Sequence, residues 1–159
     1  MKKLIGATVL IWAILSFQSC GKEEIKYTIP QTRVYLRVNL NAIDNALNSV
    51  LGYKTYTEAD RPNYGSAAYF GYAGLLLFTY SMDEYALPQI NAFDLCCPNE
   101  GQRSIMVAPN SEGKATCSTC KSVYDLTTGR PISGPSEKRL QSYSIIRSSP
   151  YNGVFTVQN

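Results

Sequence analysis

The fold of this chain is constrained most by a series of short apolar or alternating segments, punctuated by glycines and prolines. Residues 34–40 alternate with period two, which is typical of a half-buried strand. Residues 75–80 form a largely apolar run that predicts a buried strand, and residues 90–95 predict its neighbour. Further short strands are predicted at residues 104–107, 114–116, 122–126, 140–147 and 154–158. We therefore expect an all-β domain, a small antiparallel sandwich or barrel.

One segment departs from the strand pattern and predicts a short helix near the N-terminus of this domain. Five apolar residues fall there on one helical face and a glycine follows as a stop: Ile43, Ala46, Leu47, Val50, Leu51 and Gly52. From Tyr53 to Phe70 we find no clean periodicity, together with several tyrosines, a proline and a glycine. That segment is predicted to be a loop.

The N-terminus has the pattern of an export signal. Two lysines precede an uninterrupted apolar run, residues 4–15, that is shorter than a bilayer-spanning helix needs. The Ser19-Cys20 pair that follows resembles the lipobox of lipoproteins from the Bacteroidetes, which implies that Cys20 carries the lipid. We predict a signal peptide at 1–19, a lipidated N-terminus and tether at 20–33, and one β domain at 34–159. The lipid would attach the protein to an outer membrane, on its periplasmic or cell-surface face.

Charge and composition exclude several functions. Cleavage would remove Lys2 and Lys3 and leave 13 basic and 12 acidic residues, a net charge of +1. Nucleic acid is not expected as a partner, because phosphate binding needs a concentrated excess of lysine and arginine. The chain has no histidine, which excludes histidine-dependent catalysis and imidazole ligands to a metal. The acid pairs Asp83-Glu84 and Asp94 with Glu100 are interpreted as solvated loop carboxylates and not as a catalytic pair.

The cysteines carry the functional information. Cys96 and Cys97 are adjacent, and Cys117 and Cys120 form a C-x-x-C pair twenty residues later. Together with the Asp-Leu before Cys96, the aromatic-Asp pair after Ser122 and the Gly134-Pro135 turn, these residues resemble the Rieske domain. In that family two loops hold a [2Fe-2S] cluster through two cysteines and two histidines, and the Gly-Pro turn packs beside the cluster. The resemblance covers about a third of the chain well and implies a small antiparallel β fold.

The departure from the family falls on the cluster ligands. Cys97 and Cys117 occupy the two cysteine positions, whereas Asn99 stands at the first histidine position and Cys120 at the second. The resemblance implies Cys97, Cys117 and Cys120 as metal ligands, with Cys96 as a candidate fourth. The cofactor would be a [2Fe-2S] cluster that serves electron transfer to a redox protein partner, or a zinc ion held by the same cysteines.

A metal-free alternative stays open. Cysteines that share one iron in the Rieske arrangement lie close enough to be joined, so Cys97 and Cys117 would form a disulfide in an oxidising compartment. The protein would then be a surface or periplasmic lipoprotein that keeps the fold for binding or structure. Thiol oxidoreductase chemistry at the C-x-x-C pair is disfavoured, because such pairs begin helices and residues 122–126 predict a strand. In either case we expect a binding or electron-transfer module and not an enzyme.

Overall fold

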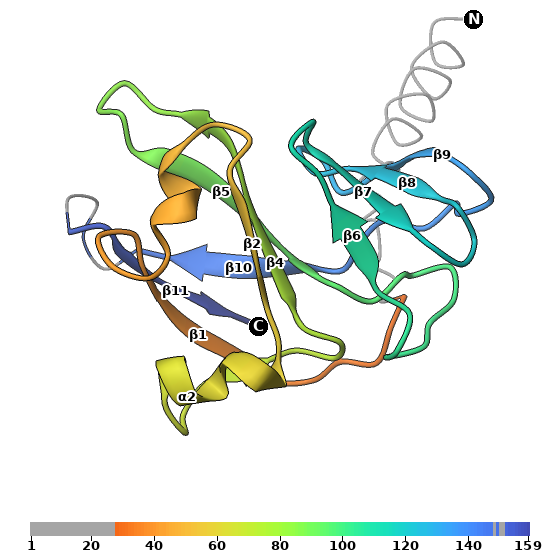
Figure 1. The fold of residues 1–159 in the computed structure, drawn as a ribbon, viewed down its shortest axis with the longest axis horizontal. Helices are drawn as coiled ribbons and strands as arrows, with labels where there is room; N and C mark the ends of the chain where they lie inside the picture. Colours follow the sequence, from red (N-terminus) through yellow and green to blue (C-terminus); the bar gives the residue numbers. More distant parts are fainter. Residues whose placement is uncertain (1–27, 148, 150–151) are drawn as a thin grey trace, which may run out of the picture.

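Two antiparallel sheets form the part of the chain that the computed structural model describes, residues 28–147, 149 and 152–159 (Figure 1). The smaller sheet packs to one side of the larger one. The predicted signal peptide at 1–19, Cys20 and the first part of the tether lie outside the described residues. Within the described residues, no helix is both long enough and apolar enough to span a bilayer. The all-β antiparallel class predicted from the sequence is confirmed.

The larger sheet has seven strands in the spatial order β2-β4-β5-β10-β11-β1-β3. The strands are β1 (Val34–Asn39), β2 (Tyr53–Tyr56), β3 (Tyr69–Phe70), β4 (Leu75–Met82), β5 (Pro88–Asp94), β10 (Ser142–Ile146) and β11 (Val154–Gln158). The smaller sheet has the order β6-β7-β8-β9. Its strands are β6 (Val107–Pro109), β7 (Lys114–Cys117), β8 (Val123–Asp125) and β9 (Pro131–Ser133).

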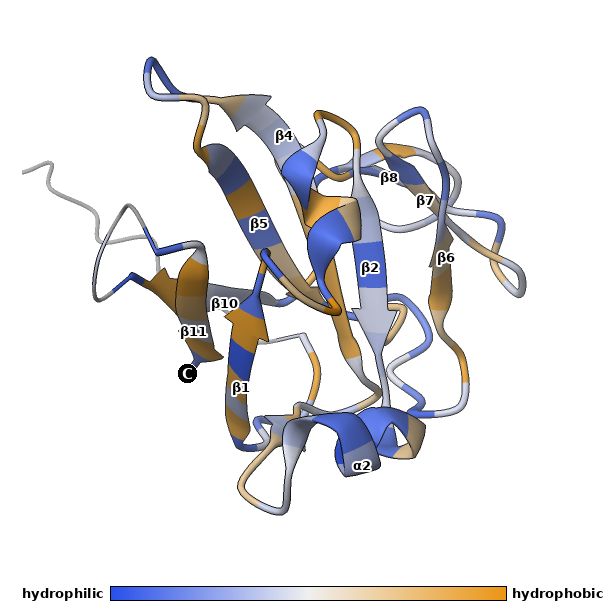
Figure 2. Ribbon diagram, turned by 60° about the vertical axis from the view of Figure 1, so that its left-hand side comes forward, coloured by the Kyte–Doolittle hydropathy of each residue, from blue (hydrophilic) through white to orange (hydrophobic). Residues whose placement is uncertain are grey.

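The larger sheet curls so that its two ends face one core. In β1 every second residue is buried, and apolar and polar residues alternate along the strand (Figure 2). These side chains share one cluster with residues of β2 and β4 from the far side of the strand order. Tyr64 packs at the seam between the edge strands, with its ring centroid 5.5 Å from that of Tyr56 in β2 and 6.4 Å from that of Phe70 in β3. The sheet is therefore a nearly closed barrel.

Strand β4 is buried on both faces, as its apolar run predicts. Leu75 and Leu77 point into the barrel core, whereas Leu76 and Phe78 pack in a second cluster against the smaller sheet. Because successive side chains of a strand point to opposite faces, one strand serves both cores. The second cluster also contains two of the cysteines, Cys97 and Cys117.

The predicted short helix is present only as one 3-10 turn, η2 (Asn45–Asn48). Its predicted apolar face is wrong in detail: Leu47 is buried, but Ile43 and Val50 are each about half exposed. The reason is the neighbouring Asp44, which is fully buried and accepts hydrogen bonds from the Asn39 amide (2.8 Å) and from the Lys54 ammonium (2.9 Å). This tertiary network overrides the local helical pattern.

The predicted loop at 53–70 is also wrong, because it contains regular structure. Strand β2 pairs with β4 from Tyr53–Phe78 to Tyr56–Leu75. It is followed by a 3-10 turn, η3 (Glu58–Asp60), a single helical turn, α2 (Arg61–Tyr64), and strand β3. Strand β2 is short and lies at the edge of the sheet, so its conformation depends on pairing with β4. Its own sequence therefore shows no alternating pattern from which the strand could be predicted. Similarly, β9 was not predicted, and the strand expected at 104–107 begins only at Val107.

Candidate metal centre

Two loops bring three cysteine sulfurs together. The first loop (residues 97–101) follows β5, and the second loop (residues 117–122) joins β7 to β8. The sulfurs of Cys97, Cys117 and Cys120 all lie within 4.8 Å of one another, and those of Cys97 and Cys120 are 3.7 Å apart. Cys97 and Cys117 are fully buried, whereas Cys120 is partly exposed. The group therefore has one side open to solvent, and it contains the three residues predicted as metal ligands.

The second loop is a tight turn whose backbone points toward the sulfurs. The Lys121 amide donates to the Cys117 carbonyl over 3.0 Å, and Lys121 has a left-handed φ of 63°. The backbone amides of Cys120 and Thr119 act to lower the pKa of Cys117, and the Ser122 amide acts to lower the pKa of Cys120. Such donors favour thiolates, the form of cysteine that binds metals.

The thiols differ in acidity. Burial raises the pKa of Cys117 to about 11, although the backbone amides of Cys120 and Thr119 act in the opposite direction. At Cys120 burial raises the pKa, but hydrogen bonds from Ser122 and from the other two thiols outweigh it, so that its pKa lies below the ordinary value. Cys120 is therefore a stronger acid than Cys117.

Cys96 does not belong to the group. Its thiol points the other way and donates to the Gln102 carbonyl over 3.3 Å. Burial, followed by the charge of Asp94, raises the pKa of Cys96 to about 12. Cys96 and Cys97 are consecutive on extended backbone and so face opposite sides. The structure thus does not bring the candidate fourth ligand to the metal centre.

Asn99, which stands at the family's first histidine position, is exposed. Its side-chain amide donates to Glu100 Oε1 over 3.1 Å. Within the described residues, the group of potential ligand atoms that includes Cys97 holds only the three cysteines.

The carboxylate of Asp94 holds the approach to the first loop, and sequence reasoning missed this role. Asp94 is fully buried at the end of β5, so its interpretation as a solvated loop residue is wrong. Its Oδ1 accepts hydrogen bonds from the amides of Cys96 (2.8 Å) and Ala73 (3.1 Å), and its Oδ2 accepts from the Tyr72 amide (2.7 Å) and the Tyr143 hydroxyl (2.8 Å). The position of Asp94 just before the cysteines was the available signal, because a buried carboxylate needs such donors.

The Gly134-Pro135 turn packs beside the second loop, as the Rieske resemblance implies. A Cβ on Gly134 would lie 2.5 Å from Ser122 Cα, so only glycine allows this approach. Ser122 Oγ accepts a hydrogen bond from the Ser136 amide over 3.0 Å, and it lies 3.2 Å from the Cys120 sulfur, within hydrogen-bond distance. The turn therefore positions the hydroxyl that contacts Cys120.

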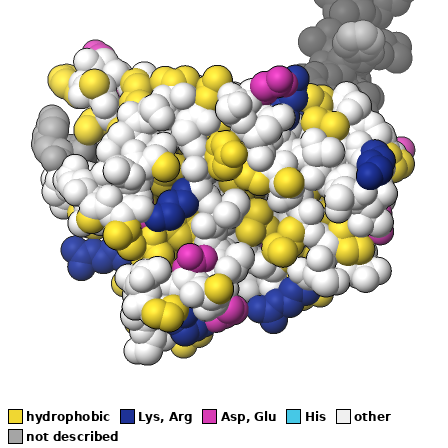
Figure 3. All heavy atoms as spheres, viewed as in Figure 1, with side chains coloured by type: hydrophobic (Ala, Val, Ile, Leu, Met, Phe, Trp, Pro, Cys, Tyr) yellow, Lys and Arg dark blue, Asp and Glu magenta, His cyan; other side chains and the backbone are white. Residues whose placement is uncertain are grey.

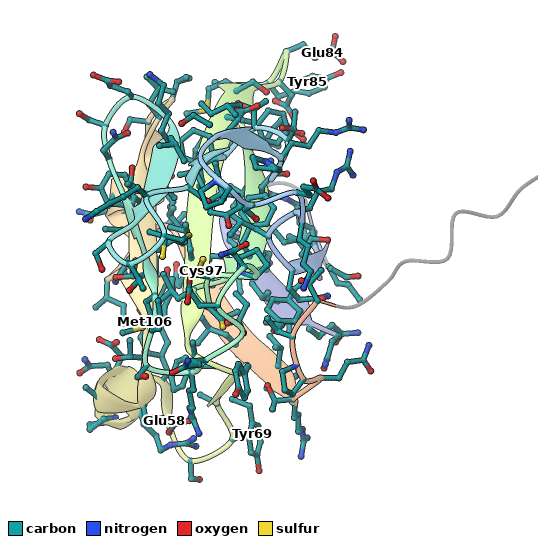
Figure 4. The ribbon with its side chains drawn as sticks, turned by 90° about the vertical axis from the view of Figure 1, so that its right-hand side faces the viewer. Glu58, Tyr69, Glu84, Tyr85, Cys97 and Met106 are labelled. Atoms are coloured by element: carbon teal, nitrogen blue, oxygen red, sulfur yellow. The ribbon has the colours of Figure 1, made fainter. Side chains whose placement is uncertain are left out.

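One tyrosine also contacts the sulfur group. The Tyr124 hydroxyl lies 3.5 Å from the Cys97 sulfur, and burial raises the pKa of Tyr124. Figure 4 places Cys97 midway between two ends of the molecule, with Glu84 at one end and Glu58 at the other. On the face shown in Figure 3, basic and acidic side chains are interspersed and form no single-sign patch.

These residues do not fit a Rieske cluster. A two-iron cluster needs two ligands on each iron, and in the Rieske arrangement the ligand at the Cys120 position binds a different iron from Cys97 and Cys117. Here the Cys120 sulfur is only 3.7 Å from that of Cys97, and Asn99 offers no ligand. Around one tetrahedral ion with metal–sulfur bonds of about 2.3 Å, sulfurs are roughly 3.8 Å apart. The spacing therefore fits a single ion.

Comparisons with known proteins leave the family open. No family model matches the chain, and no curated protein matches it. Among solved structures, the fold is similar to a chain described as an NADH-dependent nitrite reductase small subunit from Mycobacterium tuberculosis. The TM-score is 0.40 and the sequence identity 13%, over 80% of this chain and 96% of the other. A similarity at this level carries no functional argument.

Proposed function

We propose that this protein is an exported lipoprotein whose β domain binds one thiophilic metal ion, zinc, through Cys97, Cys117 and Cys120. The observation that carries the proposal is the convergence of three sulfurs within 4.8 Å, two of them fully buried. Thiolate sulfur is a preferred ligand of zinc, and a site of this kind is usually tetrahedral. The protein would act as a metal-binding module and not as a catalyst.

Several features support binding over simple packing of thiols. The Cys97–Cys120 sulfur distance of 3.7 Å is close to the edge of a tetrahedral zinc–thiolate site. The backbone amides of Thr119 and Cys120 favour negative charge on the Cys117 sulfur, and the Ser122 amide favours it on the Cys120 sulfur. On binding, each thiol would release its proton, and the partly exposed side at Cys120 gives ion and proton a route to solvent.

Export and lipidation are supported by the sequence pattern before the β domain. The basic start, the short apolar run and the Ser19-Cys20 pair together favour cleavage and attachment of lipid at Cys20. An outer-membrane location, periplasmic or at the cell surface, follows from this proposal. It is tested by expressing the full chain with Cys20→Ala in a bacterial host that processes lipoproteins. The variant should lose incorporation of labelled fatty acid, and incorporation equal to that of the unaltered chain would refute lipidation at Cys20.

The metal proposal is tested on the full chain, solubilised from membranes in detergent under anaerobic conditions. Elemental analysis should find about one zinc per chain. The variant Cys117→Ser should lose most of it, whereas Ser118→Ala, an exposed neighbour, should keep it. Iron in place of zinc would instead assign electron transfer to the site. A metal-free protein with two fewer free thiols before reduction than after it would favour the disulfide-stapled module and refute the proposal.

A further inference from the structure

We infer that Glu100 supplies the fourth ligand to the ion, so that the first loop binds through Cys97 and Glu100 as the second binds through Cys117 and Cys120. The inference rests on the proposed metal-binding function and deepens it, because it names the complete ligand set. Its basis is a repeated backbone conformation in the two loops.

The two loops make the same turn. In the first, the Gly101 amide donates to the Cys97 carbonyl over 2.9 Å, and in the second the Lys121 amide donates to the Cys117 carbonyl over 3.0 Å. Both bonds join a cysteine to the fourth residue after it. That fourth residue is left-handed in both loops, with φ of 66° at Gly101 and 63° at Lys121.

The cysteine that begins each loop is also held by a backbone hydrogen bond, although the acceptors lie at different spacings along the chain. The Cys97 amide donates to the Ile105 carbonyl and the Cys117 amide to the Ser122 carbonyl, each over 2.9 Å, so both loops leave from a paired backbone. The third residue after the cysteine is Cys120 in the second loop, where it is a member of the sulfur group. In the first loop that residue is Glu100, which has a ligand of another kind at the same place in the turn.

A glutamate side chain reaches further from its backbone than a cysteine. Its carboxylate is two bonds further from the backbone than a cysteine sulfur, with additional rotatable bonds. Glu100 is half-buried, and its carboxylate accepts a hydrogen bond from the exposed Asn99 side chain. An exposed hydrogen bond of this kind contributes little to stability, so turning Glu100 toward a cation costs little.

The other oxygens near the sulfurs are poorer ligands. Ser122 Oγ already accepts from the Ser136 amide, and the Tyr124 hydroxyl belongs to a fully buried ring. Neither a serine hydroxyl nor a tyrosine phenol is among the usual zinc ligands, whereas carboxylate oxygen is. Three thiolates and one carboxylate would then close the tetrahedron.

The test uses the full chain in detergent, with Zn²⁺ as the ion and Glu84 as the control position. Glu84 is exposed and lies at one end of the molecule, away from Cys97 (Figure 4). Zinc affinity of Glu100→Gln should fall by roughly tenfold or more, since even outer-shell changes cost ten- to a hundredfold. Glu84→Gln should bind as the unaltered chain does. The zinc absorption edge should report three sulfurs and one oxygen, and four sulfurs in Glu100→Cys.

Two outcomes would overturn the inference, and they are distinct. Affinity of Glu100→Gln equal to that of Glu84→Gln, or three sulfurs remaining in Glu100→Cys, would leave the metal site standing and remove Glu100 from it. An unaltered chain that binds no Zn²⁺ would refute the proposed function itself and this inference with it.

Discussion

Replacing Asp94 by asparagine removes one acceptor oxygen from a buried site that satisfies four donors. The carboxylate accepts three backbone amides and the Tyr143 hydroxyl. In the better amide orientation, oxygen stays at Oδ1 and still accepts from Ala73 and Cys96. The new NH₂ then faces the Tyr72 amide, which loses its acceptor, while the Tyr143 hydroxyl can rotate to accept.

The magnitude follows from these contacts. A buried donor without a partner costs about 1–3 kcal/mol, and a hydrogen bond to a charged acceptor contributes about 1.5–3 kcal/mol against about 1 kcal/mol for a neutral one. Taken near the lower ends of these ranges, about 1.5 kcal/mol for the orphaned amide and about 0.5 kcal/mol for each of three weakened bonds, the loss is about 3 kcal/mol. With a urea m-value of about 2 kcal/mol per molar, the midpoint should fall by roughly 1.5 M.

Urea unfolding followed by circular dichroism measures this loss. The single tryptophan, Trp12, lies in the predicted signal peptide, so tryptophan fluorescence would not report on the β domain. The matched control is Asp125→Asn, since Asp125 accepts from the Thr127 amide and the Thr128 hydroxyl in an exposed turn. It should cost less than about 1 kcal/mol. Equal midpoints for the two variants would show that the four hydrogen bonds of Asp94 do not provide this stability.

Three further results are expected. Gly134→Ala should destabilise by about 3 kcal/mol, through the clash with Ser122 and a left-handed φ of 88°, and a loss below about 1 kcal/mol would contradict the packing argument. Burial and Asp44 raise the pKa of Tyr56, so its contribution to the free energy of unfolding is full below about pH 10 and falls above that pH, as the tyrosine of the unfolded chain ionises. Tyr56→Phe should therefore make the free energy of unfolding less dependent on alkaline pH, by up to about 1.4 kcal/mol per pH unit, in unfolding curves measured above about pH 10. Chelation of a bound ion should lower Tm by roughly 10 °C in calorimetry, and an unchanged Tm would count against a tightly bound ion.

The strand pattern could be predicted from sequence because it depends on local alternation. Val34–Asn39 buries every second side chain, and Leu75–Phe78 is apolar throughout since both of its faces are covered. The helix at Ile43–Leu51 was overestimated for the opposite reason. A buried Asp44 and a left-handed Leu51 interrupt it, and neither depends on the spacing of apolar residues.

In the candidate site, too, some features could be predicted from sequence and others depend on tertiary contacts. The meeting of Cys97, Cys117 and Cys120 was predicted through the Rieske resemblance, and the structure brings their sulfurs together. The turn at Glu100-Gly101 was not predicted, because its equivalence to the C-x-x-C loop lies in backbone hydrogen bonds. The burial of Asp94 was missed because its donors come from segments distant along the chain.

The double role of β4 links the metal centre to the folding of the whole domain. Alternate side chains of β4 belong to the two apolar clusters. Opening of the barrel at β4 would therefore also break the contacts of Leu76 and Phe78 with the smaller sheet. Denaturation should therefore be all-or-none, and the slowest amide exchange should be found along β4 and β5. An ion bound by the two loops would also slow amide hydrogen exchange in β4 and β5, at residues that do not contact the ion.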